Sequence, residues 1–163
     1  MSHRAALFPL LALVLSACGG SGKGAAEAVQ ALLAAQVRGD AAAFEKGIDR
    51  PALRNDLRQQ ITQLAKQSGL DVGGPSDPAL DRMIVPDAFH LSLGGAPLLQ
   101  APSVPQVAAQ LKTLAKDRVC LHDLAGAQAC RLVFAQEGGG WRLVAMPADH
   151  PTIELAPEPP KKD

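Results

Sequence analysis

The chain has 163 residues, with 16 basic and 16 acidic side chains, so its formal net charge at neutral pH is zero. Proteins that bind nucleic acid usually carry a basic stripe and aromatic stacking platforms, whereas this chain has one Trp and no Tyr. Composition therefore excludes nucleic acid as an expected partner. It also argues against a carbohydrate site built on aromatic faces.

The first 17 residues have the layout of a secretory signal peptide. Met1 to Arg4 supply a short positive region, and Ala5 to Val14 form an apolar stretch shorter than the roughly 20 residues that a membrane-spanning helix needs. Small residues then precede Cys18. We therefore expect residues 1–17 to be a signal peptide that is removed before Cys18.

The segment Leu15-Ser16-Ala17-Cys18 resembles the lipobox of bacterial lipoproteins, in which an aliphatic residue, two small residues and a cysteine direct lipid attachment to that cysteine. The resemblance implies that Cys18 carries diacylglycerol and palmitate-type chains, which anchor the protein to a membrane. Gly19 resembles the residue found after the cysteine in lipoproteins sorted to the outer membrane. The expected location is the periplasmic face of the outer membrane, with the inner membrane left open. The alternative is an ordinary signal with an accidental cysteine.

Removal of residues 1–17 leaves 146 residues, which is enough for one domain and short for two. We expect a lipidated cysteine and flexible glycine-rich tether over residues 18–24 and a single domain over 25–155. The Pro-rich, charged residues 156–163 are expected to be a disordered tail.

Apolar periodicity and capping residues predict helices in the first two thirds of the domain. The second is capped by Asp40, the third begins near Asp49 and Pro51, the fourth is capped by Asp77, and the last starts with a Ser103 capping box. Leu53, Leu57, Ile61 and Leu64 are expected to face the core. The predicted helices cover residues 25–38, 41–46, 49–67, 77–83 and 103–117, with a further short segment from Pro86.

Alternating patterns predict strands at residues 118–123, 127–136 and 141–146. The glycine-containing loops between them are short enough for antiparallel hairpins. The sequence therefore predicts an α+β domain in which N-terminal helices pack on a C-terminal three-stranded antiparallel meander.

Cys120 and Cys130 flank the first of these hairpins. A three-residue loop over 124–126 would place Asp123 opposite Ala127 and Cys120 opposite Cys130, close enough for a disulfide. Export to an oxidising compartment favours that disulfide. The alternatives are two free buried thiols, or metal coordination by the cysteines with His122.

No motif predicts a catalytic residue, a metal site or a cofactor. His90, His122 and His150 are scattered and lack metal-ligand spacing. Asp81 lies one helical turn after the capping residue Asp77 and is expected to face water. A serine hydrolase using Ser92 and His90 stays open, although no nucleophile-elbow motif supports it.

Several short segments resemble a bacterial family described only as a domain of unknown function. In that family a helix ends at Gly-Asp, and a (Val/Ile)-Asp-x-Pro-Ala-Leu-Arg segment opens the next helix. Arg50 stands where the family often has an aromatic residue, and the cysteine pair is a local addition. The resemblance implies a fold and leaves activity open. The matching segments are Arg38–Phe44, Ile48–Arg54, Asp77–Leu80, Val85-Pro86, Trp141–Leu143 and Pro147.

The order of helices before a curved meander is also similar to the ketosteroid-isomerase-like cone folds, which enclose an apolar pocket. Their tyrosine oxyanion donors have no counterpart here, because the chain has no Tyr. We therefore expect a non-catalytic, lipid-anchored envelope protein that binds a protein partner or a small apolar ligand near the membrane. A toxin-immunity or hydrolase-inhibitor lipoprotein is the second hypothesis, and a small pocket enzyme is the third.

Overall fold

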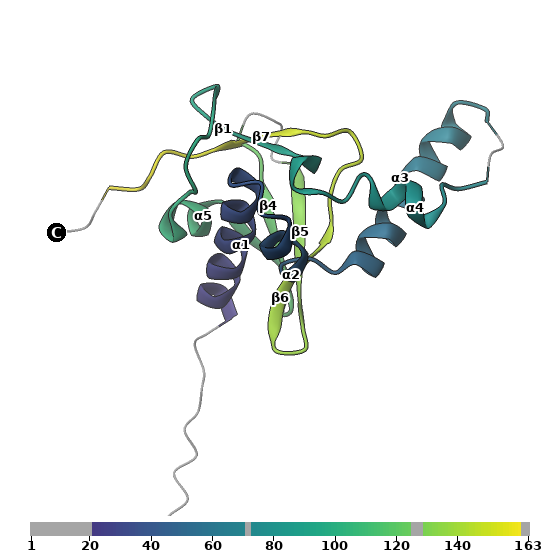
Figure 1. Cartoon of the computed structure of the whole chain (residues 1–163). Helices are drawn as coiled ribbons and strands as arrows, with labels where there is room; N and C mark the ends of the chain where they lie inside the picture. Colours follow the sequence, from purple (N-terminus) through teal and green to yellow (C-terminus); the bar gives the residue numbers. More distant parts are fainter. Residues whose placement is uncertain (1–20, 71–72, 125–128, 161–163) are drawn as a thin grey trace, which may run out of the picture.

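The computed structural model describes residues 21–70, 73–124 and 129–160, with the backbone alone at residues 21–23 (Figure 1). The predicted signal peptide and Cys18 lie outside the described residues. The helices are α1 Ser21–Val37, α2 Ala41–Lys46, α3 Arg50–Gln67, α4 Asp77–Asp81 and α5 Val104–Gln110, with a 3-10 turn η1 at Pro86–Ala88. The strands are β1 His90–Leu93, β2 Ala96–Pro97, β3 Leu111–Ala115, β4 Arg118–His122, β5 Cys130–Glu137, β6 Gly140–Ala145 and β7 Thr152–Leu155. The predicted α+β class is confirmed.

Helix α1 starts four residues before the predicted helix. The sequence predicts a flexible tether up to Gly24, but the helix already begins at Ser21. Gly24 lies beside the indole of Trp141, and Ala25 and Ala26 are buried. Packing of this first turn against β6 offsets the conformational cost of glycine in a helix. Residues 18–20 of the predicted 18–24 segment lie outside the described residues.

Local capping explains the start of the next two helices. The Asp40 carboxylate accepts a hydrogen bond from the Ala43 amide at 3.0 Å, and the Asp49 carboxylate accepts one from the Ala52 amide at 2.9 Å. Pro51 occupies the first turn of α3, where its missing N–H costs nothing. These boundaries agree with the sequence prediction because each depends on contacts only three residues apart.

The apolar face predicted for α3 is only half correct. Leu53 and Leu57 are fully buried, but Leu64 is 57% exposed. In Figure 1 the helix leaves the body of the domain and its later turns project beyond the sheet. Periodicity identified a helix face whose contact with the core extends to the half-buried Ile61, whereas Leu64 in the following turn is exposed.

Asp77 and Asp81 do not have their predicted roles. Ser76, not Asp77, is the residue before α4, and its side chain makes no capping bond. The Asp77 carboxylate pairs with Arg58 of α3. Asp81 does not simply face water, because it accepts hydrogen bonds from Arg54 at 2.8 and 2.6 Å and from Arg50 at 3.1 Å. The hydrogen bonds from Arg54 and then Arg50 hold the pKa of Asp81 below its ordinary value. Helix α4 packs on the outward arginines of α3, a neighbour that the sequence alone did not indicate.

The predicted helix over 103–117 divides into a helix and a strand. The Ser103–Gln106 capping box is present, but α5 ends at Gln110 and β3 begins at Leu111. Leu111 pairs with Leu121 and Thr113 pairs with Val119 of β4. Sheet pairing therefore overrides the helical spacing of Leu111 and Leu114, and Leu114 is left exposed.

Strand β3 makes the meander four-stranded, in the order β3-β4-β5-β6, rather than three-stranded as predicted. Alternate residues of the last three strands face the main core, where α1 packs. The Gly47–Asp49 segment bonds the edge strand β6 through Leu143. The core-facing residues of β4–β6 are Val119, Leu121, Leu132, Phe134, Trp141 and Leu143.

A second sheet, with the order β2-β1-β7, is absent from the sequence prediction. The segment expected after Pro86 is a single 3-10 turn, and the chain then enters β1. Strand β7 lies parallel to β1, with His90 opposite Thr152 and Leu93 opposite Leu155. Figure 1 shows this sheet at the end of the domain opposite the start of α1.

Buried polar side chains hold the other side of β7 where no strand pairs with it. The Gln110 amide donates to the carbonyls of His122 at 2.9 Å and Glu154 at 3.0 Å, and its oxygen accepts from Ala156 at 2.8 Å. The Asp123 carboxylate accepts from the Glu154 amide at 3.0 Å. Together with the Leu124 amide, which donates to the Glu154 carbonyl at 3.3 Å, these side chains supply the partners that a neighbouring strand would otherwise provide. Ala156, predicted to open a disordered tail, is instead hydrogen-bonded.

The predicted cysteine pairing is present, but the predicted strand register is wrong. The Cys120 and Cys130 sulfurs lie 1.94 Å apart, at disulfide distance, with their Cα atoms 5.7 Å apart. Cys130 is opposite His122, and Cys120 is opposite Val133, because a register shift follows Leu121. The bond therefore runs diagonally across the two strands. The predicted loop residues 125 and 126, and Ala127, lie outside the described residues.

Candidate functional site

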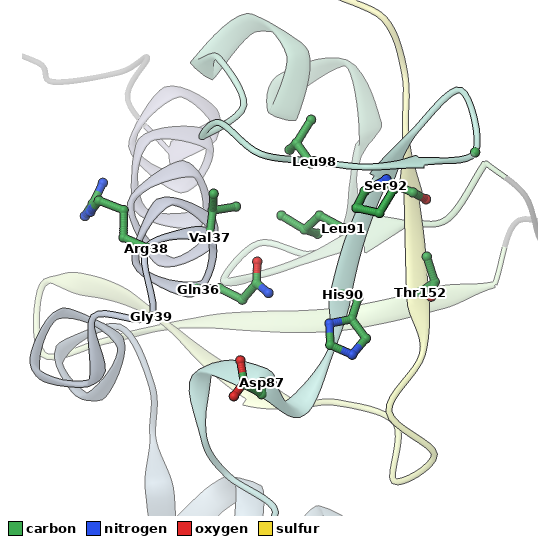
Figure 2. Close-up of a pocket in the computed structure, with 12 residues that line it drawn as sticks. Gln36, Val37, Arg38, Gly39, Asp87, His90, Leu91, Ser92, Leu98 and Thr152 are labelled. Atoms are coloured by element: carbon green, nitrogen blue, oxygen red, sulfur yellow. The ribbon is translucent and has the colours of Figure 1, made fainter.

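The main candidate site is an open cleft of about 630 Å³ between the C-terminal end of α1 and the second sheet. Figure 2 shows α1 on one side of the cleft and β1 on the other. Residues from η1, the β1–β2 turn and β7 complete its lining. The lining residues are Gln36, Val37, Arg38, Gly39, Asp87, His90, Leu91, Ser92, Gly95, Pro97, Leu98 and Thr152.

One part of the cleft is apolar. Val37 reaches in from the last turn of α1, and Leu91 and Leu98 face it from β1 and from the segment after β2 (Figure 2). Leu91 belongs to the buried core, while Val37 and Leu98 pack on its margin. An apolar ligand group could lie against these three side chains and lose contact with water.

The other part of the cleft is polar. Gln36, Asp87 and His90 lie around it in Figure 2. The Gln36 side-chain amide donates to the Phe89 carbonyl at 3.0 Å, which fixes the orientation of the amide group. Its Oε1 atom is buried and has no hydrogen-bond partner among the described residues. This side of the cleft therefore carries an acceptor whose partial negative charge is not compensated.

Ser92 is not arranged as a nucleophile. Its side chain is 6% exposed, and its hydroxyl donates to the Glu154 carboxylate. Glu154 also accepts from the Gly95 amide at 3.2 Å, and so holds the glycine turn between β1 and β2. The Ser92 hydrogen bond, followed by those of the Gly95 and Gly94 amides, lowers the pKa of Glu154. Ser92 thus orders the wall of the cleft, and no histidine receives its proton.

We expect Glu154→Gln to remove a pH-dependent part of the stability. Because the folded-state pKa of Glu154 lies below its ordinary value of 4.5, the stabilisation is complete above that value and is lost as the pH falls through the folded pKa. The melting temperature of the wild type should exceed that of the variant most at neutral pH, and the gap should narrow in acid. Thermal unfolding between about pH 7 and pH 3 measures this difference.

Glu27→Gln is the matched control, because Glu27 is exposed on α1 and lies far from the second sheet in the sequence. The difference in melting temperature between Glu27→Gln and the wild type should not change across the same pH range. A gap for Glu154→Gln that stays constant or grows on acidification would contradict the assigned role of this carboxylate.

The three candidate histidines do not form one site. His90 lines the cleft, and His122 ends β4 beside the cysteine pair. His150 lies before β7 at a positive φ of 50°, with Nδ1 3.4 Å from the Asp87 carbonyl oxygen. Within the described ranges, no three His, Cys, Asp or Glu side chains are grouped so that they could hold a metal ion.

Sequence reasoning missed the cleft because its two walls are far apart along the chain. Gln36 and Phe89 are separated by 53 residues, and Ser92 and Glu154 by 62. The only local signal was the short alternating stretch from His90 to Leu93 before two glycines, which is typical of a hairpin strand.

Among the helices of the described residues, none combines the length and apolar character needed to cross a membrane. Comparison of the chain with protein-family models, with curated proteins and with solved structures finds no match.

Proposed function

We propose that this chain is a lipid-anchored protein of the bacterial cell envelope, and that its α+β domain binds a small ligand without chemical conversion. The anchor follows from the lipobox at Leu15–Cys18. The observation that supports binding is the cleft at the end of α1, which combines an apolar wall with a few polar groups.

The chemistry of the cleft supports binding rather than catalysis. The Ser92 hydroxyl is hydrogen-bonded to Glu154, so it lacks the histidine base that activates a serine nucleophile. His90 and Ser92 both lie on β1, and the Glu154 carboxylate accepts a hydrogen bond from the Gly95 amide in the turn that follows this strand. These contacts favour a rigid receptor wall over an acyl-transfer site.

The position of the cleft favours a ligand from the aqueous side. Helix α1 has 17 residues and is therefore about 25 Å long at 1.5 Å per residue. Two residues would separate an anchor at Cys18 from the start of α1, whereas the cleft is lined by Gln36, Val37 and Arg38 at the other end of the helix. In the proposed arrangement, α1 holds the cleft away from the bilayer.

Lipidation is tested by growing cells that express the full chain with an alkyne fatty acid and then detecting the label on the protein. We expect the wild type to be labelled and found in the membrane fraction. Cys18→Ser should lose the label and leave that fraction, because its hydroxyl cannot accept the diacylglycerol thioether. Ser16→Ala is the matched control, since it keeps a small residue before the cysteine and should be labelled normally. An unlabelled wild type, or a labelled Cys18→Ser variant, would overturn the anchor.

A further inference from the structure

The polar part of the cleft contains oxygen atoms that carry negative charge or partial negative charge. Asp87 is exposed there, and it makes no side-chain hydrogen bond or ion pair with any described residue. The buried Gln36 Oε1 atom is closed to direct contact with a ligand and adds partial negative charge beneath the cleft surface. The cleft also lies at the C-terminal end of the 17-residue helix α1, where the helix dipole favours positive charge. All three features favour positive charge, and the accessible Asp87 carboxylate can also accept hydrogen bonds.

The cationic side chains near the cleft do not occupy this position. Arg38 lines the rim, and in Figure 2 its guanidinium points away from the centre of the cleft. His150 approaches the backbone carbonyl of Asp87, not its carboxylate. The His90 side chain lies beside the polar part and makes no hydrogen bond or ion pair with a described residue, while its backbone amide donates to the Pro151 carbonyl at 2.9 Å. The Asp87 carboxylate therefore has room for a positive group from outside the chain.

The apolar wall determines what else the ligand must carry. Val37, Leu91 and Leu98 lie at one end of the cleft, and Asp87 lies at the other (Figure 2). A fully hydrated inorganic cation would leave this wall in contact with water. An organic cation with an apolar body would cover it, and burial of that body would add to the binding free energy.

We infer that the cleft binds a small organic ammonium ion, with its charged group toward Asp87 and its apolar body against Val37, Leu91 and Leu98. This inference rests on the proposed function, because it names the ligand class of the same cleft. An ammonium group supplies N–H donors to the carboxylate, and charge-assisted hydrogen bonds of this kind are stronger than neutral ones.

Three probes that share one apolar ring test the ligand class: cyclohexylmethylammonium, cyclohexylmethanol and cyclohexanecarboxylate. Each is titrated into the full-length protein in detergent while methyl NMR signals of Val37, Leu91 and Leu98 are followed. We expect the ammonium probe to shift these signals saturably and to bind most tightly, followed by the alcohol and then the carboxylate. Asp87→Asn should lower the affinity for the ammonium probe about threefold to fivefold, as expected for an exposed charge pair. The affinity for the alcohol should not change.

Asp149→Asn is the matched control. It removes the same charge from an exposed aspartate that does not line the cleft, so ammonium affinity should stay at the wild-type value. Equal weakening by both substitutions would overturn the assignment of Asp87. Binding of the carboxylate at least as tightly as the ammonium, with the same methyl shifts, would overturn the ligand class and leave the cleft as a binding site. No methyl shift with any probe would overturn both the ligand class and the role of the cleft as a binding site. Lipid attachment at Cys18 would still be tested separately by the fatty-acid label.

Discussion

Leu57→Ala is expected to lower the free energy of unfolding by about 2–5 kcal/mol, because it removes a fully buried side chain and leaves a cavity that the core cannot fully close. Leu57 lies in the part of α3 that packs on the core. Urea unfolding of the full chain measures the change, and the fluorescence of the single Trp141 reports loss of the core next to α1.

Leu64→Ala provides a control of identical chemistry on the same helix. Leu64 is 57% exposed, so its truncation should change the free energy of unfolding by no more than about 0.5 kcal/mol. A comparable loss of stability for both variants would mean that the later turns of α3 are covered in solution, which would contradict the observed packing of this helix.

Gln110→Ala is expected to lower the free energy of unfolding by about 2–4 kcal/mol. Unlike Leu57→Ala, this substitution acts mainly through lost hydrogen bonds. The 5% exposed side chain bonds three backbone groups, those of His122, Glu154 and Ala156. The substitution would remove the side-chain partner of the His122 carbonyl and the Ala156 amide, while the Glu154 carbonyl would keep the Leu124 amide at 3.3 Å. Urea unfolding gives the global effect, and hydrogen exchange at the Ala156 amide should show faster opening around β7.

Gln63→Ala, on the exposed surface of α3, is the control for loss of a glutamine and should have little effect. If Gln110→Ala were as stable as this control, the Gln110 side chain would not be what holds the free side of β7. The same result would weaken the view that β7 forms a fixed wall of the cleft, since Glu154 and Thr152 both belong to that strand.

The helical half of the fold was predictable because its signals are local. Asp40, Asp49 and Ser103 each bond an amide three residues ahead, so the sequence shows both partners within one turn. The apolar faces of α1 and of the first turns of α3 could be recognised in the same way. The Cys120–Cys130 pairing was also accessible, because one short hairpin separates the two residues.

The sheets were less predictable because the local sequence pattern fits more than one secondary structure or register. Pairing with a neighbouring strand decides which of them forms. Leu111 and Leu114 have helical spacing, yet pairing with β4 places Leu111 in a strand. The register shift after Leu121 depends on how two strands meet, so a loop-length argument did not anticipate it. The sequence predicted that Asp81 faces water because it does not show that Arg50 and Arg54 of α3 lie beside this carboxylate.

For this protein, the sequence by itself determined the starts of α2, α3 and α5, the α+β class, the cysteine pairing and the expectation of a lipid anchor. The tertiary structure alone decided the second sheet and the cleft, because the parallel pairing of β1 with β7 brings together residues about 60 positions apart. Capping and periodicity act within a turn or a strand and can be recognised in a short segment. A binding wall built from α1, η1, β1 and β7 exists only after those segments have packed.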